Sequence, residues 1–189
     1  MKPTDVLKEE HRGIELMMDI LEAILQRMEK NENPDLGHLG RILEFFQVFA
    51  DKCHHGKEED LLFPSLEAAG VPREGGPVAV MLSEHEHGRA FIRGMKAGIE
   101  QMKSGNPDDS SVFRENAWNY IMLLRQHIDK EENILFRIAD AHIPHERQEE
   151  LLEEFEKIET EKIGPGKHEE YHRLLHEFKG LYINEVNVS

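Results

Sequence analysis

The same pattern of histidine, lysine and glutamate occurs twice in this chain. Both copies follow H-x-x-K-E-E-x-x-L-F, with His54 and Glu58 in the first copy and His127 and Glu131 in the second. Residues four apart lie on the same face of a helix, so each copy can direct an imidazole and a carboxylate towards one point. Imidazole and carboxylate without thiolate suit iron, manganese or zinc. The repeat therefore predicts two halves of a metal site.

The elements that hold these residues are predicted to be helices. The chain has 189 residues, which is enough for one domain with a sizeable core. Leu, Glu, Lys, Ile and Met are abundant and strand-forming residues are sparse, so we expect an all-α protein.

Charge and cysteine content argue against several classes of function. The formal net charge is −15, which would repel phosphates, so we expect no nucleic-acid partner and no membrane partner. The single cysteine, Cys53, cannot form an internal disulfide and fits a reducing compartment. The first residues lack an apolar signal core, and no apolar run is long enough to span a membrane. These features predict a cytoplasmic protein.

Apolar residues recur at steps of three and four along four stretches, which is typical of helices that pack in a bundle. The predicted helices cover approximately residues 4–30, 36–63, 78–103 and 111–141. Leu61 and Ile134 are assigned to the inward faces of the second and fourth helices, and Pro64 is expected to interrupt the second. Short connections favour an antiparallel up-down-up-down four-helix bundle.

A histidine interrupts the apolar stripe of the first and third helices, His11 in one and His85 in the other. Each alone is equally well explained as a histidine that finds a hydrogen bond at the edge of the core. In antiparallel neighbours, however, these two lie at the same depth as the histidines of the repeated motif. Two glutamates lie one turn further along, and a buried carboxylate without a cation is costly. Together these positions predict a buried metal centre.

Only the first histidine and the first glutamate of each motif copy are predicted to face inward. His55 points about a third of a turn away from His54 and is expected to be exposed. Glu59 and Glu132 are excluded for the same reason, and Cys53 is expected to be a buried thiol rather than a ligand. The predicted core ligands are His11, His54, Glu58, His85, His127 and Glu131.

This number of ligands is too large for one octahedral ion with an open position. It fits two ions bridged by Glu58 and Glu131, with the histidines as terminal ligands. A single tetrahedral zinc ion is the alternative, but it would leave several of these groups unused.

These residues resemble the hemerythrin-like, or HHE cation-binding, family. The resemblance covers about residues 5–142 and rests on the segments Glu10-His11-Arg12, His54 to Pro64, Met81 to Arg89 and His127 to Phe136. It implies an antiparallel four-helix bundle that holds two non-haem iron ions, for which manganese or zinc could substitute. The ligands it implies are the same six residues.

Two departures from the family pattern concern the ligands. The third helix of oxygen-carrying hemerythrins supplies two histidines one turn apart, whereas Arg89 follows His85 here. Their fourth helix carries an aspartate five residues after its histidine, whereas Glu131 lies four residues after His127. The chain is thus more similar to the hemerythrin-like branch that includes sensors and di-iron proteins linked to iron–sulfur cluster repair under nitrosative stress.

The chain after the bundle is predicted to be a helical extension. We expect residues 1–142 to form the metal-binding bundle and residues 143–189 to pack on the same domain. The last helix carries His168 beside its apolar face. This histidine could belong to a solvated edge, or it could supply a fifth imidazole to the metal centre in place of the second histidine that the third helix lacks. Glu15 and water are the other candidates for that position.

Three functions are compatible with such a centre. We favour a protein that binds or senses dioxygen or a related small diatomic ligand, such as nitric oxide, because no residue near the motifs suggests a dedicated general acid or nucleophile. The alternative is a di-iron enzyme or iron donor in nitrosative or oxidative stress, which reduces peroxide or nitric oxide or serves cluster repair, with a redox partner protein. Iron storage is the third. Tyr120, the nearest hydroxyl, is expected to belong to the core.

Overall fold

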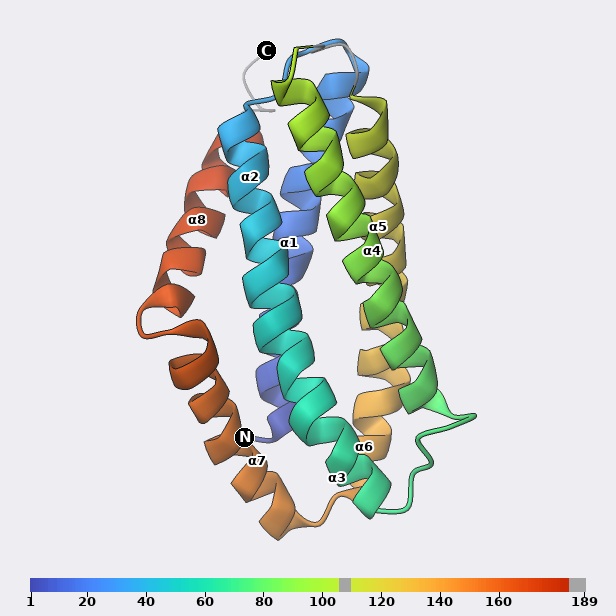
Figure 1. Cartoon of the computed structure of the whole chain (residues 1–189). Helices are drawn as coiled ribbons and strands as arrows, with labels where there is room; N and C mark the ends of the chain where they lie inside the picture. The colour runs from blue at the N-terminus through green and yellow to red at the C-terminus, as the bar shows by residue number, and fades with distance from the viewer. Residues whose placement is uncertain (106–109, 184–189) are drawn as a thin grey trace.

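The computed structural model describes residues 1–105 and 110–183, apart from the side chain of Lys162. Its regular structure is entirely helical within these residues, which confirms the predicted all-α class (Figure 1). Residues 184–189, the end of the predicted extension, lie outside the described part.

Four helical rods form an antiparallel up-down-up-down bundle (Figure 1). The first rod is α1 and the third is α4. The second and fourth rods each join α-helical segments through π-helical ones, labelled η. The bounds are α1 Pro3–Glu29; α2 Leu36–Phe45, η1 Phe46–His55, η2 Glu58–Leu62 and α3 Phe63–Ala68; α4 Pro77–Lys103; and α5 Ser111–Lys130, η3 Glu131–Leu135 and α6 Phe136–His142.

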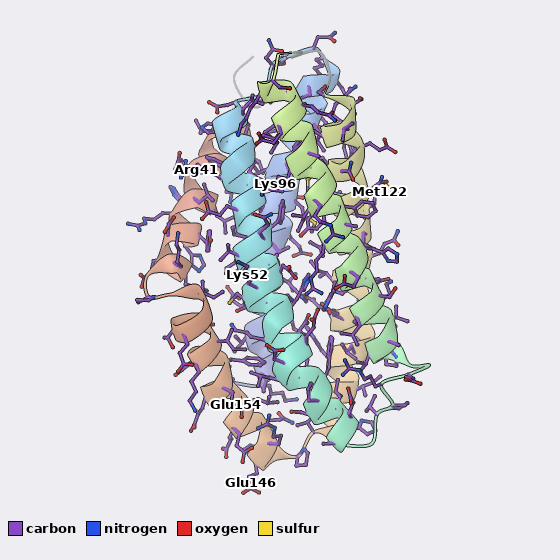
Figure 2. The ribbon with its side chains drawn as sticks, in the orientation of Figure 1. Arg41, Lys52, Lys96, Met122, Glu146 and Glu154 are labelled. Carbon is purple, nitrogen blue, oxygen red and sulfur yellow. The ribbon has the colours of Figure 1, made fainter. Side chains whose placement is uncertain are left out.

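Local sequence explains where the rods begin and how closely two of them pack. The side chain of Asp35 accepts a hydrogen bond from the backbone N–H of His38 at 3.0 Å, which caps α2. Gly98 lets α4 approach α5, because a Cβ atom at this position would lie 2.5 Å from the backbone nitrogen of Phe113. Charged side chains such as Lys96 and Glu154 project outward (Figure 2).

Two apolar clusters fill the bundle, one on each side of a level rich in histidine and glutamate. On α1, Ile14 belongs to the larger cluster and Leu7 to the smaller one, and the buried His11 lies between them. On α4, Ile92 and Met81 belong to the larger and the smaller cluster respectively. The histidines are therefore placed in a polar layer between two apolar cores.

The π-helical segments shift which residues face inward. A π turn contains about one residue more than an α turn, so the inward face moves along the sequence after it. The sequence placed Leu61 and Ile134 on the inward face, but in the structure the next residue of each, Leu62 and Leu135, faces inward. Leu62 is 1% exposed and Leu135 is fully buried, whereas Ile134 is 52% exposed. Leu61 is only partly buried.

The sequence suggested that Pro64 would interrupt the second rod, but the rod does not stop there. The helical conformation continues through it to Ala68. Pro64 lies in the first turn of α3, directly after the π-helical η2, and a proline is tolerated in a first turn because its missing N–H is not required there.

The chain after the bundle forms a helical arm along one side of it (Figure 1). The arm comprises α7 His145–Lys157, η4 Ile158–Ile163 and α8 Lys167–Tyr182. Tyr171, Leu174, Leu175 and Phe178 of α8 are buried in the larger apolar cluster, and Leu151 and Phe155 of α7 in the smaller one. Among the described residues, no helix combines the length and apolar character needed to cross a membrane.

Candidate metal centre

Six residues predicted as ligands come together in the polar layer. His11, His54, His85 and His127 are each at most 1% exposed, and Glu58 and Glu131 are fully buried. They come from all four rods, so the bundle brings together side chains that are up to 120 positions apart in the chain. Their role as metal ligands remains a prediction.

The four histidines form two pairs whose Nε2 atoms face each other. The Nε2 atoms of His11 and His54 lie 3.0 Å apart, and those of His85 and His127 lie 3.1 Å apart. Nitrogen ligands that bind one ion at about 2.1 Å on perpendicular axes would be separated by about 3 Å. Each pair is therefore spaced as two neighbouring ligands of one ion.

The two carboxylates connect these pairs. One oxygen of Glu58 lies 3.6 Å from Nε2 of His54, and the other lies 3.4 Å from Nε2 of His85. The oxygens of Glu131 lie 3.1 Å from Nε2 of His11 and 3.1 Å from Nε2 of His127. Each glutamate thus presents one oxygen to each histidine pair, which is the arrangement expected of carboxylates that bridge two ions.

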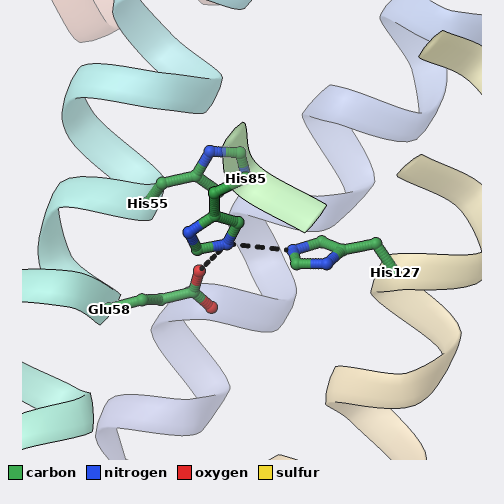
Figure 3. A group of neighbouring side chains, drawn as sticks. All are labelled: His55, Glu58, His85 and His127. Carbon is green, nitrogen blue, oxygen red and sulfur yellow. Dashed lines mark hydrogen bonds and ion pairs between the residues drawn. The ribbon is translucent and has the colours of Figure 1, made fainter. Parts of the chain in front are cut away.

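His55 is buried beside this arrangement, and the expectation that it is exposed was wrong. Its exposed fraction is 4%, and its ring stacks on that of His85 with centroids 3.9 Å apart (Figure 3). The π-helical η1 ends at His55, and its extra residue per turn brings two consecutive histidines to the interior. Candidate ligand atoms of His55, Glu58, His85 and His127 all lie within 4.8 Å of one another.

Five carboxylates support the five imidazoles from outside, and we call them the outer carboxylates. Each accepts a hydrogen bond from Nδ1 of one histidine. The pairs are Glu132 with His11 at 3.0 Å, Glu10 with His54 at 2.8 Å, Asp51 with His55 at 3.3 Å, Glu59 with His85 at 2.6 Å and Glu84 with His127 at 2.9 Å. Such contacts fix the tautomer and the ring orientation of metal-binding histidines. In a neutral imidazole held in this way, Nδ1 carries the proton and Nε2 offers its lone pair to the layer.

A basic side chain holds each outer carboxylate in turn. Lys57 binds Glu10 and Lys130 binds Glu84. Arg89 binds Glu59 and Asp51, and it stands where oxygen-carrying hemerythrins have a second histidine. Arg12 binds Glu132. These contacts explain why the repeated motif contains lysine and a second glutamate: both support the histidines although neither points into the layer.

The last two residues of each motif copy close the layer on one side. Phe63 stacks on His85 with ring centroids 6.0 Å apart, and Phe136 stacks on His11 at 5.5 Å. Both phenylalanines are fully buried in the smaller apolar cluster. Every defined position of H-x-x-K-E-E-x-x-L-F therefore has a place in building or enclosing the centre.

The electrostatics of the layer call for a cation. Both oxygens of Glu58 and one of Glu131 are buried without a hydrogen-bond partner in the described part of the chain. Burial disfavours a charged His127, yet the charge of Glu131 and the contacts of the ring nitrogens with Glu131 and Glu84 raise its pKa to about 10. His55 differs, because burial and the charge of His85 keep its pKa well below the usual value. The layer thus favours positive charge, and neutral imidazoles beside unpartnered carboxylates form a donor set that fits metal ions.

The other candidates for completing the coordination lie elsewhere. His168 contacts the rings of Phe49 and His172, with centroids 5.7 Å and 4.6 Å away, and it belongs to neither group of candidate ligands among the described residues. Glu15 forms an ion pair with Arg12 near the surface. The structure thus brings His55, rather than either of these, to the six predicted residues.

Two further side chains behave as the sequence suggested. Cys53 is 2% exposed, and burial raises the pKa of its thiol to about 12, so it is a buried thiol outside both candidate ligand groups. Tyr120 is a core residue that packs against Phe46 with ring centroids 4.8 Å apart.

Fold and site together define a four-helix bundle built to hold cations between histidines and carboxylates. The family model of the hemerythrin HHE cation-binding domain matches residues 2–139. The chain therefore belongs to this family. The match ends before the helical arm, which begins at His145.

Sequence relatives add little about function. The chain is 20% identical over 162 residues to uncharacterised proteins from Mycobacterium bovis and from two strains of Mycobacterium tuberculosis. These matches cover 86% of this chain but only 62% of the relatives, so the chain spans less than two thirds of their length. No solved structure gives a significant match.

Proposed function

We propose that this protein holds two non-haem iron ions and binds or senses dioxygen or a related small diatomic ligand. The observation that carries the proposal is the placement of Glu58 and Glu131, each with one oxygen towards each histidine pair. The membership of the HHE cation-binding family supports a non-haem metal site. Two ions at such a site would supply the electrons and the open position that a diatomic ligand requires.

The two proposed ion positions are not equivalent. One is surrounded by His11, His54 and an oxygen of each glutamate. The other has His85, His127 and the remaining glutamate oxygens, together with the additional imidazole of His55. The first position therefore has one protein ligand fewer, and we propose that the diatomic ligand binds there.

The surroundings of the layer favour reversible binding. Apolar clusters lie on both sides of the layer, and Phe136 covers His11 next to the proposed ligand position. Exclusion of water protects a bound ligand from side reactions. Tyr120 packs in the larger apolar cluster and its hydroxyl is buried without a hydrogen-bond partner in the residues described, so it is poorly placed to relay protons.

The proposal is tested by the visible spectrum of the reduced, iron-loaded protein on exposure to oxygen. We expect an absorption band that develops with oxygen and disappears on degassing over repeated cycles. Rapid, irreversible oxidation accompanied by consumption of peroxide or nitric oxide would contradict it and support the enzyme alternative. Release of iron to an acceptor protein under the same conditions would support iron donation instead.

A further inference from the structure

A cavity of about 500 Å³ lies where the helical arm meets the bundle, outside the polar layer. One wall comes from α1 and η1, with Gly13 and Phe49, and the other from η4 and α8, with Glu159, His168 and Tyr171. This volume is within the range of small-molecule sites. The second wall lies outside residues 2–139, the part of the chain that the family model matches.

The interior of the cavity is largely aromatic. Phe49 and Tyr171 are 4% and 3% exposed, and their ring centroids lie 5.9 Å apart. The ring of His168 lies 5.7 Å from that of Phe49 and 4.6 Å from that of His172. Aromatic faces attract organic cations and stack on flat aromatic ligands.

One buried polar group on the cavity wall lacks a partner. The hydroxyl of Tyr171 is buried and forms no hydrogen bond within residues 1–105 and 110–183. A buried hydroxyl without a partner carries a desolvation cost that a ligand could relieve. It can either donate or accept a hydrogen bond, so it could pair with a ring N–H or with an oxygen of a ligand.

Carboxylates surround the remaining part of the cavity. Asp5 and Glu9 are exposed on the α1 side, and Glu159 faces them from η4. The buried Lys57 ion-pairs with both Glu159 and Glu10, and Glu10 also lines the cavity. Glu10 and Glu159 together carry one more charge than Lys57 neutralises, and the two carboxylates on α1 add further negative charge. In a chain of net charge −15, this favours a cationic ligand over an anionic one.

We propose that this cavity binds a small aromatic amine, with the ring against the side chains of Phe49, Tyr171 and His168 that line it and the ammonium group near Asp5 and Glu9. The site is separate from the metal ions, so its occupancy does not depend on the proposed function. It is nevertheless close to them, because Glu10 lines the cavity and accepts the hydrogen bond of His54. A bound amine is therefore positioned to influence one of the histidines.

The test uses tryptamine as the probe and isothermal titration calorimetry on both the metal-free and the iron-loaded protein. Indole-3-acetate is the matched anion, because it carries a carboxylate on the same ring system. We expect saturable binding of tryptamine and at least about tenfold weaker binding of indole-3-acetate, since a tenfold change needs only about 1.4 kcal/mol. Absence of tryptamine binding, or equal binding of the two compounds, would overturn the proposal.

A pair of glycine substitutions locates the binding site. A Cβ atom at Gly13 would lie 3.4 Å from Leu175 and 3.7 Å from Phe49, so a Cβ is tolerated there; because Gly13 lines the cavity, the longer side chain of Gly13→Met should extend into it. At Gly180 of α8 nothing lies within 4 Å, so Gly180→Met is the control. We expect Gly13→Met to weaken tryptamine binding by at least about tenfold and Gly180→Met to leave it unchanged. Equal affinities for the two variants would overturn the assignment.

Tyr171→Phe tests the unpartnered hydroxyl. It should weaken tryptamine binding by about threefold to tenfold, as expected for one hydrogen bond, without changing the circular dichroism spectrum. An unchanged affinity would remove Tyr171 from the site. Because all titrations are repeated on the metal-free protein, a failure here is distinguishable from a failure of the proposed metal function.

Discussion

The apolar clusters and the polar layer between them are equally buried, yet they are stabilised in opposite ways. The clusters gain stability because apolar side chains such as Leu21 and Phe46 leave water. The polar layer instead gathers five imidazoles and two carboxylates, supported by outer carboxylates and basic side chains. The apolar cores explain why the bundle folds, whereas the buried carboxylates of the layer need positive charge beside them.

The backbone differs between the two regions as well. The larger apolar cluster is built mainly on regular α-helices, whereas π-helical segments end at His55 and begin at Glu58 and Glu131. Such segments are rare and are frequent at functional sites. In this chain they allow His54 and His55 to face inward together.

The largest expected effect comes from removing a bridging carboxylate. Glu58→Ala should abolish the binding of two metal ions, because this glutamate presents an oxygen to both histidine pairs. Metal analysis of the reconstituted variant checks this. Glu100→Ala, at an exposed residue of α4, should retain the metal content of the original protein. Full loading of Glu58→Ala would mean that the layer is not organised around this carboxylate.

Removing the fifth imidazole should affect one ion more than the other. His55→Ala should weaken one metal-binding step by about 10-fold or more. Loss of a group that only supports a metal ligand typically costs about 10- to 100-fold in affinity, and a ligand itself should matter at least as much. The other step should change little, because His11 and His54 remain. Stepwise metal titration separates the two. His87→Ala, on the exposed face of α4, serves as the control and should leave both steps unchanged. An unchanged titration of His55→Ala would show that His55 is a buried histidine without a ligand role.

The two motif lysines provide a matched pair. Lys57 is fully buried between Glu10 and Glu159, whereas the side chain of Lys130 is 34% exposed. Lys57→Met should destabilise the protein by about 3–5 kcal/mol, because it leaves carboxylates buried without their partner. Lys130→Met should cost less than about 1 kcal/mol. Chemical denaturation measures both, and equal losses would show that burial does not distinguish the two motif copies.

A second pair tests the shift of the inward face within η3, which ends at Leu135. Leu135→Ala should destabilise the bundle by about 2–5 kcal/mol, since it removes buried apolar atoms. Ile134→Ala should change the free energy of unfolding by less than about 0.5 kcal/mol, because Ile134 is exposed. The reverse order would indicate that the fourth rod continues as an α-helix through Glu131.

The smallest effect is expected for an outer carboxylate. Glu84→Gln should weaken metal binding by about 10-fold, because it perturbs the Nδ1 hydrogen bond of His127 but keeps the shape of the side chain. Glu100→Gln, at an exposed residue of the same helix, should leave metal affinity unchanged. Equal affinities for both variants would indicate that Glu84 has only a structural role.

The α-helical periodicity predicted the bundle and the convergence of six site residues, because His11, His85 and His127 lie in α-helices and Glu58 and Glu131 are the first residues of π-helical segments. It failed where the period changes: the inward positions of His55, Leu62 and Leu135 follow π turns that no composition signal announced. The sequence did contain two of the outer carboxylates in Glu-His pairs, at Glu10 and Glu84. Their partners lie on neighbouring rods, however, so the contacts depend on packing that one helix cannot reveal.

The most direct test of the central claim is the number of iron ions that the protein binds after anaerobic reconstitution and removal of excess metal. The arrangement of Glu58 and Glu131 predicts two ions per chain, with the second lost in Glu58→Ala. One zinc ion per chain without iron, or a protein that folds fully and binds no metal, would contradict the account.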